Sequence, residues 1–167
     1  FMDALLTGLR EATQAARYGF ANAAGEDLRG LVWVRGEGGG PGRIALTCAA
    51  CHSGRDRAGV LRMGLGNARL NLGELLADTQ GGSDDAWFRA WGPGRADVTT
   101  LEGREPVLLP DLRPLRFQQA LQWSGAMLHG STMALAIRLG TLVVTSLHER
   151  LRPPRELALG MAEYLEG

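Results

Sequence analysis

The sequence predicts an all-α fold with one small β-hairpin. Apolar residues recur at helical spacing near both ends of the chain and in a long segment ahead of the last helix. Two short runs rich in β-branched and aromatic residues flank a glycine-rich segment, a pattern typical of a hairpin. The chain has 167 residues and shows no internal repeat, low-complexity tract or linker, so we expect one domain over residues 1–167.

The first third of the chain predicts a helix followed by the hairpin. Apolar residues recur every three or four positions through Met2–Phe20, which indicates an amphipathic helix. The strand-like runs are Leu31–Arg35 and Arg43–Thr47, and Gly36–Gly42 between them is a turn or a loose loop. This hairpin delivers the chain directly to Cys48.

The middle of the chain predicts loops and short helices. Ser53–Leu72 is rich in Gly and Arg without a clear period, so we expect a loop. Short helices are expected at Gly73–Asp78, from a Ser83 cap to Trp91, and at Leu115–Trp123. Prolines and mixed polarity over Ala96–Pro114 indicate irregular, extended chain.

Two further helices are expected towards the end of the sequence. Ser131 or Thr132 can cap a helix that runs to about Leu147, and this helix is apolar on nearly every side, so it should be buried. Pro153-Pro154 then marks a break, after which Arg155–Leu165 carries apolar residues along one side.

Charge and hydropathy exclude two classes of function. The 18 basic and 18 acidic residues give a formal net charge of +0, so there is no basic footprint for nucleic acid and partner recognition must be local. The longest apolar stretches, such as Leu139–Leu147, are too short to cross a bilayer. No signal-peptide pattern begins at Phe1. We therefore expect a soluble protein with no transmembrane segment.

The only two cysteines of the chain, Cys48 and Cys51, are followed directly by His52. Two thiols at this spacing can bond to the two vinyl groups on one edge of a haem, and the next side chain can reach the iron as its fifth ligand. The motif therefore predicts one covalently bound haem c, with His52 as the proximal iron ligand. We expect the other ring nitrogen of His52 to donate to a backbone carbonyl in the loop that follows.

Other interpretations of the two cysteines explain less. A thioredoxin-type Cys-x-x-Cys belongs between a strand and a helix in a βαβ unit, and the sequence has no such alternation. A structural zinc needs four protein ligands, whereas the chain offers two thiolates and three histidines without a second Cys-x-x-Cys or a His-x-x-x-His. A disulfide between Cys48 and Cys51 would close almost no loop.

The order of the predicted helices and loops along the chain is a second feature, besides the motif, that indicates the fold. An N-terminal helix, Cys48-x-x-Cys51-His52, loops with short helices, and a last helix ending in Tyr164-Leu165 together resemble the monohaem cytochrome c superfamily of c-type cytochromes. A looser likeness to di-haem peroxidases lies in Leu109–Arg113 and Met127–Ser131, but a single haem motif excludes a complete enzyme of that kind. The resemblance implies a cytochrome c fold around the haem.

The resemblance also implies a function and a location. It implies electron transfer between extracytoplasmic redox partner proteins, or a role as the haem subunit of a larger, membrane-associated complex. Covalent haem attachment takes place outside the cytoplasm, so the expected location is the periplasm or another extracytoplasmic compartment, and the sequence is the mature form after signal removal. As an electron carrier, the protein needs no catalytic residues.

The sixth position on the iron decides between carrier and enzyme. The resemblance favours His148 as the distal ligand, because the number of residues between His148 and Tyr164 of the last helix is typical of that ligand in the family. His129 is the alternative through the peroxidase-like segment, and Met127 or Met133 offers a thioether sulfur. The alternative function is a haem enzyme or sensor, peroxidase-like or binding a diatomic gas, with a weak or open sixth site.

Overall fold

The computed structural model describes residues 12–20, 30–35, 43–80, 82–97, 105–121, 125, 127–145 and 152–167. The chain falls into two compact units. The first unit comprises Phe1–Ala96 with Pro106–Asp111, and the second comprises Asp97–Glu105 with Leu112–Gly167. Whether the two units form a single domain stays a prediction.

The fold is mixed α/β, so the all-α prediction is wrong. Besides its helices, the described part of the chain contains eight short strands, paired into four two-stranded antiparallel sheets. Three of these sheets escaped sequence reasoning because their strands are only two or three residues long, too short to show a period of two. The strands are β1 Leu31–Val34, β2 Arg43–Leu46, β3 Ser53–Arg55, β4 Leu61–Met63, β5 Arg95–Ala96, β6 Val107–Leu108, β7 Ala120–Leu121 and β8 Met127–Leu128.

Most of the predicted helices are confirmed where the structure describes them. Ser131 caps the long helix, because its Oγ accepts a hydrogen bond from the Ala134 amide at 3.2 Å. None of the helices in the described ranges combines the length and the apolar character needed to cross a membrane. The helices are α2 Ala12–Arg17, α3 Cys48–Cys51, α4 Leu72–Gln80, α5 Asp85–Arg89, the 3-10 helix η2 Arg113–Phe117, α6 Thr132–Thr145 and α7 Arg155–Glu166.

Two predicted segments of the middle region differ from the structure. Ser53–Leu72 is not simply a loop, because β3 and β4 form a hairpin within it, with Ser53 opposite Met63. Asp56 shapes the turn of this hairpin, since its Oδ1 accepts hydrogen bonds from the amides of Ala58 and Val60 at 3.0 and 2.9 Å. Of the helix predicted over Leu115–Trp123, the structure describes residues 115–121, where the 3-10 helix η2 ends at Phe117 and the strand β7 follows.

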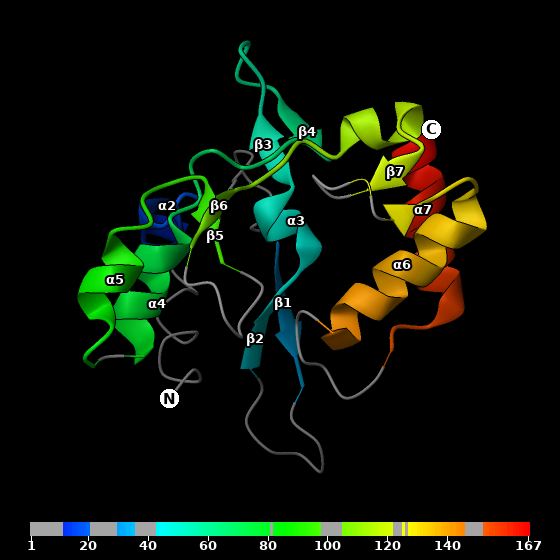
Figure 1. Ribbon diagram of the computed structural model, residues 1–167. Helices are drawn as coiled ribbons and strands as arrows, with labels where there is room; N and C mark the ends of the chain where they lie inside the picture. The colour runs from blue at the N-terminus through cyan, green and yellow to red at the C-terminus, as the bar shows by residue number, and fades with distance from the viewer. Residues whose placement is uncertain are drawn as a thin grey trace. The chain divides into compact units, whose positions relative to one another are not determined.

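The core of the first unit lies around the start of the haem motif. Figure 1 shows the β1–β2 hairpin leading into α3, and α4 and α5 side by side. The predicted hairpin is confirmed, with Leu31 opposite Leu46 and Val34 opposite Arg43. One cluster of buried core residues comes from α2 and the turn after it, from α3, and from α4 with the segment before it: Ala15, Tyr18, Phe20, Ala50, Leu70 and Leu75.

The second unit is built on the pair α6 and α7, against which η2 packs (Figure 1). Small residues allow the two long helices to approach closely; Gly140 is buried and would place a Cβ 4.0 Å from that of Ala158. The prediction that α6 is buried on nearly every side is wrong, because Met133 and Ile137 are 57% and 61% exposed. The buried core residues of this unit are Leu135, Ala136, Ala158, Ala162 and Leu165.

A charged cluster around Asp78 ties α2 and α5 to α4. The Tyr18 hydroxyl donates to Asp78 Oδ2 at 2.9 Å, Arg17 Nη2 lies 2.9 Å from the same oxygen, and Arg89 Nη2 donates to Oδ1 at 2.5 Å. Burial alone would raise the pKa of Asp78, but the hydrogen bonds from Arg89 and Tyr18 and the charge of Arg17 outweigh it. The pKa therefore lies below its ordinary value, and the charged carboxylate holds the three helices together.

Replacing Asp78 with asparagine is expected to destabilise the protein by about 1–2 kcal/mol at pH 7, since two ion pairs are lost while part of the hydrogen bonding survives. The folded pKa is depressed, so this contribution is present above the unfolded pKa of about 3.9 and is lost as pH falls through the folded value. Urea unfolding at pH 7 and at acidic pH measures the difference in the free energy of unfolding.

Glu163→Gln, at an exposed carboxylate of α7, is the control. A difference between wild type and Asp78→Asn that persists at the acidic pH would contradict this account.

Candidate haem site

The structure places the three residues of the motif together on one short helix and the residue after it. Cys48–Cys51 forms α3, which His52 ends by donating its amide to the Cys48 carbonyl at 3.0 Å. Residues three apart on a helical turn lie on the same side, so the two thiols share one face. Both cysteines are free thiols, with Cys48 exposed and Cys51 half-buried. This arrangement suits two thioether bonds to one edge of a haem.

Gly30 lies against the backbone of α3 and holds it in place. The Thr47 amide donates to the Gly30 carbonyl at 2.8 Å, which joins the start of α3 to the residue before β1. A Cβ built on Gly30 would lie 2.2 Å from both Cα and N of Ala50, so only glycine allows this approach. Gly30 also has φ +93°, a conformation that other residues rarely adopt.

Asn67 is the second support of the helix. Its amide nitrogen Nδ2 donates to the Ala50 carbonyl at 3.1 Å and to the Gly19 carbonyl at 3.0 Å. Its backbone amide donates to the Cys51 carbonyl at 2.8 Å, and its Oδ1 accepts from the Arg69 amide at 3.2 Å. Asn67 is 4% exposed, so these bonds satisfy polar groups that water does not reach.

His52 is held by a carbonyl distant in sequence. Its Nδ1 lies 3.2 Å from the carbonyl oxygen of Pro110, 58 residues farther along the chain. This corrects the prediction that the carbonyl belongs to the loop directly after His52. A proton on Nδ1 leaves the lone pair of the neutral ring on Nε2, the nitrogen that can bind a metal.

Burial keeps the imidazole of His52 neutral. It lowers the pKa of His52 below the ordinary value, and the Pro110 carbonyl and the charge of Asp111 offset this only in part. A metal binds the neutral ring, so the lowered pKa favours ligation at neutral pH.

Cys51 lacks the character of a redox-active cysteine. Burial, with a smaller contribution from Cys48, raises the pKa of Cys51 to about 11. A catalytic thiol of the thioredoxin type needs a lowered pKa, because the thiolate is the nucleophile. Cys51 itself is therefore poorly suited to act as the attacking thiol.

The residues of the motif fit a covalent haem. In such an attachment the thiols would bond to carbons of the haem rather than to its iron, so the motif would supply one metal ligand and would need no converging set of donors. In the described ranges, no three His, Cys, Asp or Glu side chains are grouped so that they could hold a metal ion.

His129 lies in the second unit, between β8 and α6. It is 5% exposed, and neither ring nitrogen has a hydrogen-bond partner within the described structure. Its Nδ1 lies 3.8 Å from Glu166 Oε1, while Glu166 Oε2 accepts a hydrogen bond from the Thr132 hydroxyl. This buried imidazole is thus next to a carboxylate that another residue already orients.

The structure does not single out any of the other candidates for the distal iron ligand. His148 lies outside the described residues. Met127 is half-buried on β8, and Met133 is 57% exposed at the start of α6. The choice among His148, His129, Met127, Met133 and an open position therefore stays a prediction.

Three residues that support the motif escaped the sequence reasoning: Gly30, Asn67 and Pro110. Gly30 is one of 24 glycines, and nothing in its neighbourhood distinguishes it. Asn67 stands in a segment whose composition predicts a loop, and Pro110 acts through its backbone carbonyl, which every residue has. No protein-family model, curated protein or solved structure matches this chain.

Proposed function

We propose that this protein carries one haem c, bound through thioethers to Cys48 and Cys51 with His52 as the proximal iron ligand, and that it transfers single electrons. The observation that carries the proposal is the arrangement of α3: two unpaired thiols on one helical turn, followed by an imidazole that a backbone carbonyl orients. A structural zinc site would require four protein ligands, and within the described ranges no three His, Cys, Asp or Glu side chains are grouped to hold a metal ion.

When bound, the haem supplies a one-electron change at its iron. The protein contributes position and electrostatics. The two thioethers would fix one edge of the group to α3. The Pro110 carbonyl accepts the Nδ1 proton of His52, which sets the orientation of the ring and makes Nε2 a stronger donor to metal. Asn67 and Gly30 hold the backbone that carries these residues.

The proposal extends to compartment and partners. Because haem is attached to such motifs outside the cytoplasm, the protein would act in the periplasm or another extracytoplasmic compartment. Its partners would be redox proteins, met singly or within a larger membrane-associated complex.

Production of the protein together with c-type maturation machinery tests the proposal. We expect purified protein whose mass is increased by that of one haem and whose pigment stays with the polypeptide in acid–acetone. The variant Cys48→Ala/Cys51→Ala controls for adventitious pigment and should have the mass of the bare chain. Colourless wild-type protein, or pigment that acid–acetone extracts, would overturn the proposal.

The distal ligand is tested by replacing His148 and His129 separately with alanine in the haem-loaded protein. We expect a low-spin ferric spectrum for wild type and for His129→Ala, and a high-spin spectrum for His148→Ala, because loss of a strong sixth ligand weakens the ligand field. Met133→Ala serves as the control for a thioether ligand. A low-spin spectrum that survives His148→Ala would refute the assignment, and rapid binding of carbon monoxide by wild type would favour the enzyme or sensor.

A further inference from the structure

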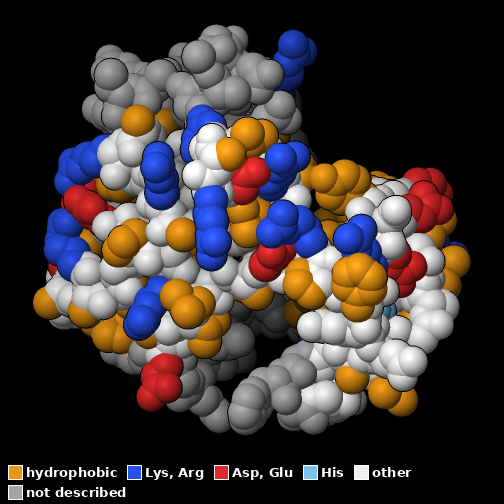
Figure 2. All heavy atoms as spheres, turned by 90° about the horizontal axis from the view of Figure 1, so that it is seen from above, with side chains coloured by type: hydrophobic (Ala, Val, Ile, Leu, Met, Phe, Trp, Pro, Cys, Tyr) orange, Lys and Arg blue, Asp and Glu red, His pale blue; other side chains and the backbone are white. Residues whose placement is uncertain are grey.

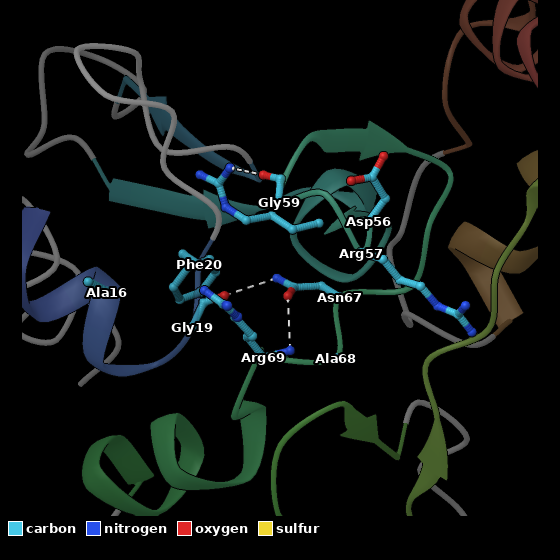
Figure 3. Close-up of a pocket in the computed structure, with 10 residues that line it drawn as sticks. Ala16, Gly19, Phe20, Asp56, Arg57, Gly59, Asn67, Ala68 and Arg69 are labelled. Atoms are coloured by element: carbon cyan, nitrogen blue, oxygen red, sulfur yellow. Dashed lines mark hydrogen bonds between the residues drawn. The ribbon is translucent and has the colours of Figure 1, made fainter.

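The first unit contains a pocket that the haem motif does not use. The pocket lies between the β3–β4 turn, the end of α2 and the segment 67–69, and its volume is about 370 Å³ (Figure 3). This volume is within the range of small-molecule sites. The lining residues that matter for recognition are Phe20, Arg55, Asp56, Arg57, Gly59 and Arg69.

The charge of the lining is positive. Arg55, Arg57 and Arg69 all contribute to it, and Asp56 is the one acidic residue among the described lining residues. The carboxylate of Asp56 is already engaged, because Oδ1 accepts two turn amides and Oδ2 pairs with Arg62 Nε at 2.9 Å. It therefore does little to neutralise the pocket. The face seen in Figure 2 likewise has many arginine side chains spread across it.

The donors of the pocket are guanidinium groups rather than amides. Arg55 is anchored at the rim, where its Nη1 donates to the Gly59 carbonyl at 2.7 Å. Figure 3 shows Arg69 running beside Phe20 and Asn67, whereas Arg57 extends away from them. The side-chain amide of Asn67 is occupied by backbone groups. Arginine stays charged at all relevant pH values and binds carboxylate or phosphate oxygens in pairs.

We propose that this pocket binds a small oxyanion with two negative charges, such as a phosphate group, with Arg69 as the principal donor and Arg55 as the second. Two guanidinium charges beside a buried aromatic ring favour such a group over a neutral ligand. The residues that line the pocket do not include Cys48, Cys51 or His52.

Calorimetric titration with inorganic phosphate tests the site, with sodium chloride adjusted to hold the ionic strength constant. We expect saturable binding of one phosphate by wild-type protein and the same stoichiometry with sulfate. Arg69→Gln should weaken binding about tenfold or more, because a charge-assisted hydrogen bond is lost. Arg69→Lys, which keeps the charge but loses the paired geometry, should lie between the two.

Arg152→Gln is the matched control, since it removes the same charge from an exposed position of the second unit. Its phosphate affinity should equal that of wild type. A titration that never saturates, or an equal loss of affinity in Arg69→Gln and Arg152→Gln, would overturn the proposal. Circular dichroism of each variant establishes whether it is folded. If Arg69→Gln does not fold, Arg69→Lys still tests the role of Arg69.

Discussion

Gly30→Ala is expected to destabilise the first unit by about 3–5 kcal/mol, because it combines overpacking with an unfavourable backbone conformation. The new Cβ would lie 2.2 Å from Ala50 Cα, an atom of the α3 backbone that cannot rotate aside. The left-handed φ of +93° adds a further cost for any residue with a Cβ. Urea unfolding followed by circular dichroism measures the loss as a lower midpoint.

Gly59→Ala is the matched control for this substitution. Gly59 has a similar φ of +80°, but a Cβ there would meet nothing within 4 Å. It should therefore show the backbone cost alone, about 1 kcal/mol. Equal losses in Gly30→Ala and Gly59→Ala would mean that contact with α3 is unimportant. Under the proposed function, production with maturation machinery should yield less attached haem for Gly30→Ala than for Gly59→Ala, since only Gly30→Ala would displace the helix that carries both thiols.

The sequence identifies Cys48, Cys51 and His52 as the candidate site, whereas it does not identify the residues that support them. Cys48, Cys51 and His52 are adjacent in the chain, so their spacing alone specifies what they can reach. The carbonyl that orients His52 comes from Pro110, and the close approach to Ala50 comes from Gly30. Contacts of this kind depend on how distant segments fold together, and no local pattern of residue types encodes them.

The fold shows the same division between local pattern and tertiary context. The strand-like runs Leu31–Arg35 and Arg43–Thr47 predicted β1 and β2 correctly, because each run is long enough to indicate a strand. The strands β5 to β8 have two residues each and arise from pairing rather than from propensity. The composition of α6 indicated burial all round, yet Ile137 is 61% exposed, since one face suffices to pack against α7.

Asn67 is a further support that comes from tertiary structure. Its side chain, in an irregular segment, makes hydrogen bonds to the backbone of α3 and of two other segments. Its amide bridges the carbonyls of Gly19 and Ala50, and thus joins the end of α2 to the motif helix. The shape of the side chain matters less than its donors: the Ala50 carbonyl is buried and the Gly19 carbonyl is partly buried, and each would lose this partner with the amide. Substitutions that keep the volume but remove the donors separate the two effects.

Asn67→Ala is expected to cost about 2–4 kcal/mol, from three side-chain hydrogen bonds lost at a buried position. Asn67→Asp keeps the size and the acceptor to Arg69 but turns an oxygen towards two carbonyl oxygens, so it should be at least as destabilising. Asn71→Ala, which removes a half-buried amide that bonds only to Glu74, should cost less than half as much. Urea midpoints of the three variants test this order. Near-wild-type stability of Asn67→Asp would show that the donors of Asn67 do not hold α3 in place.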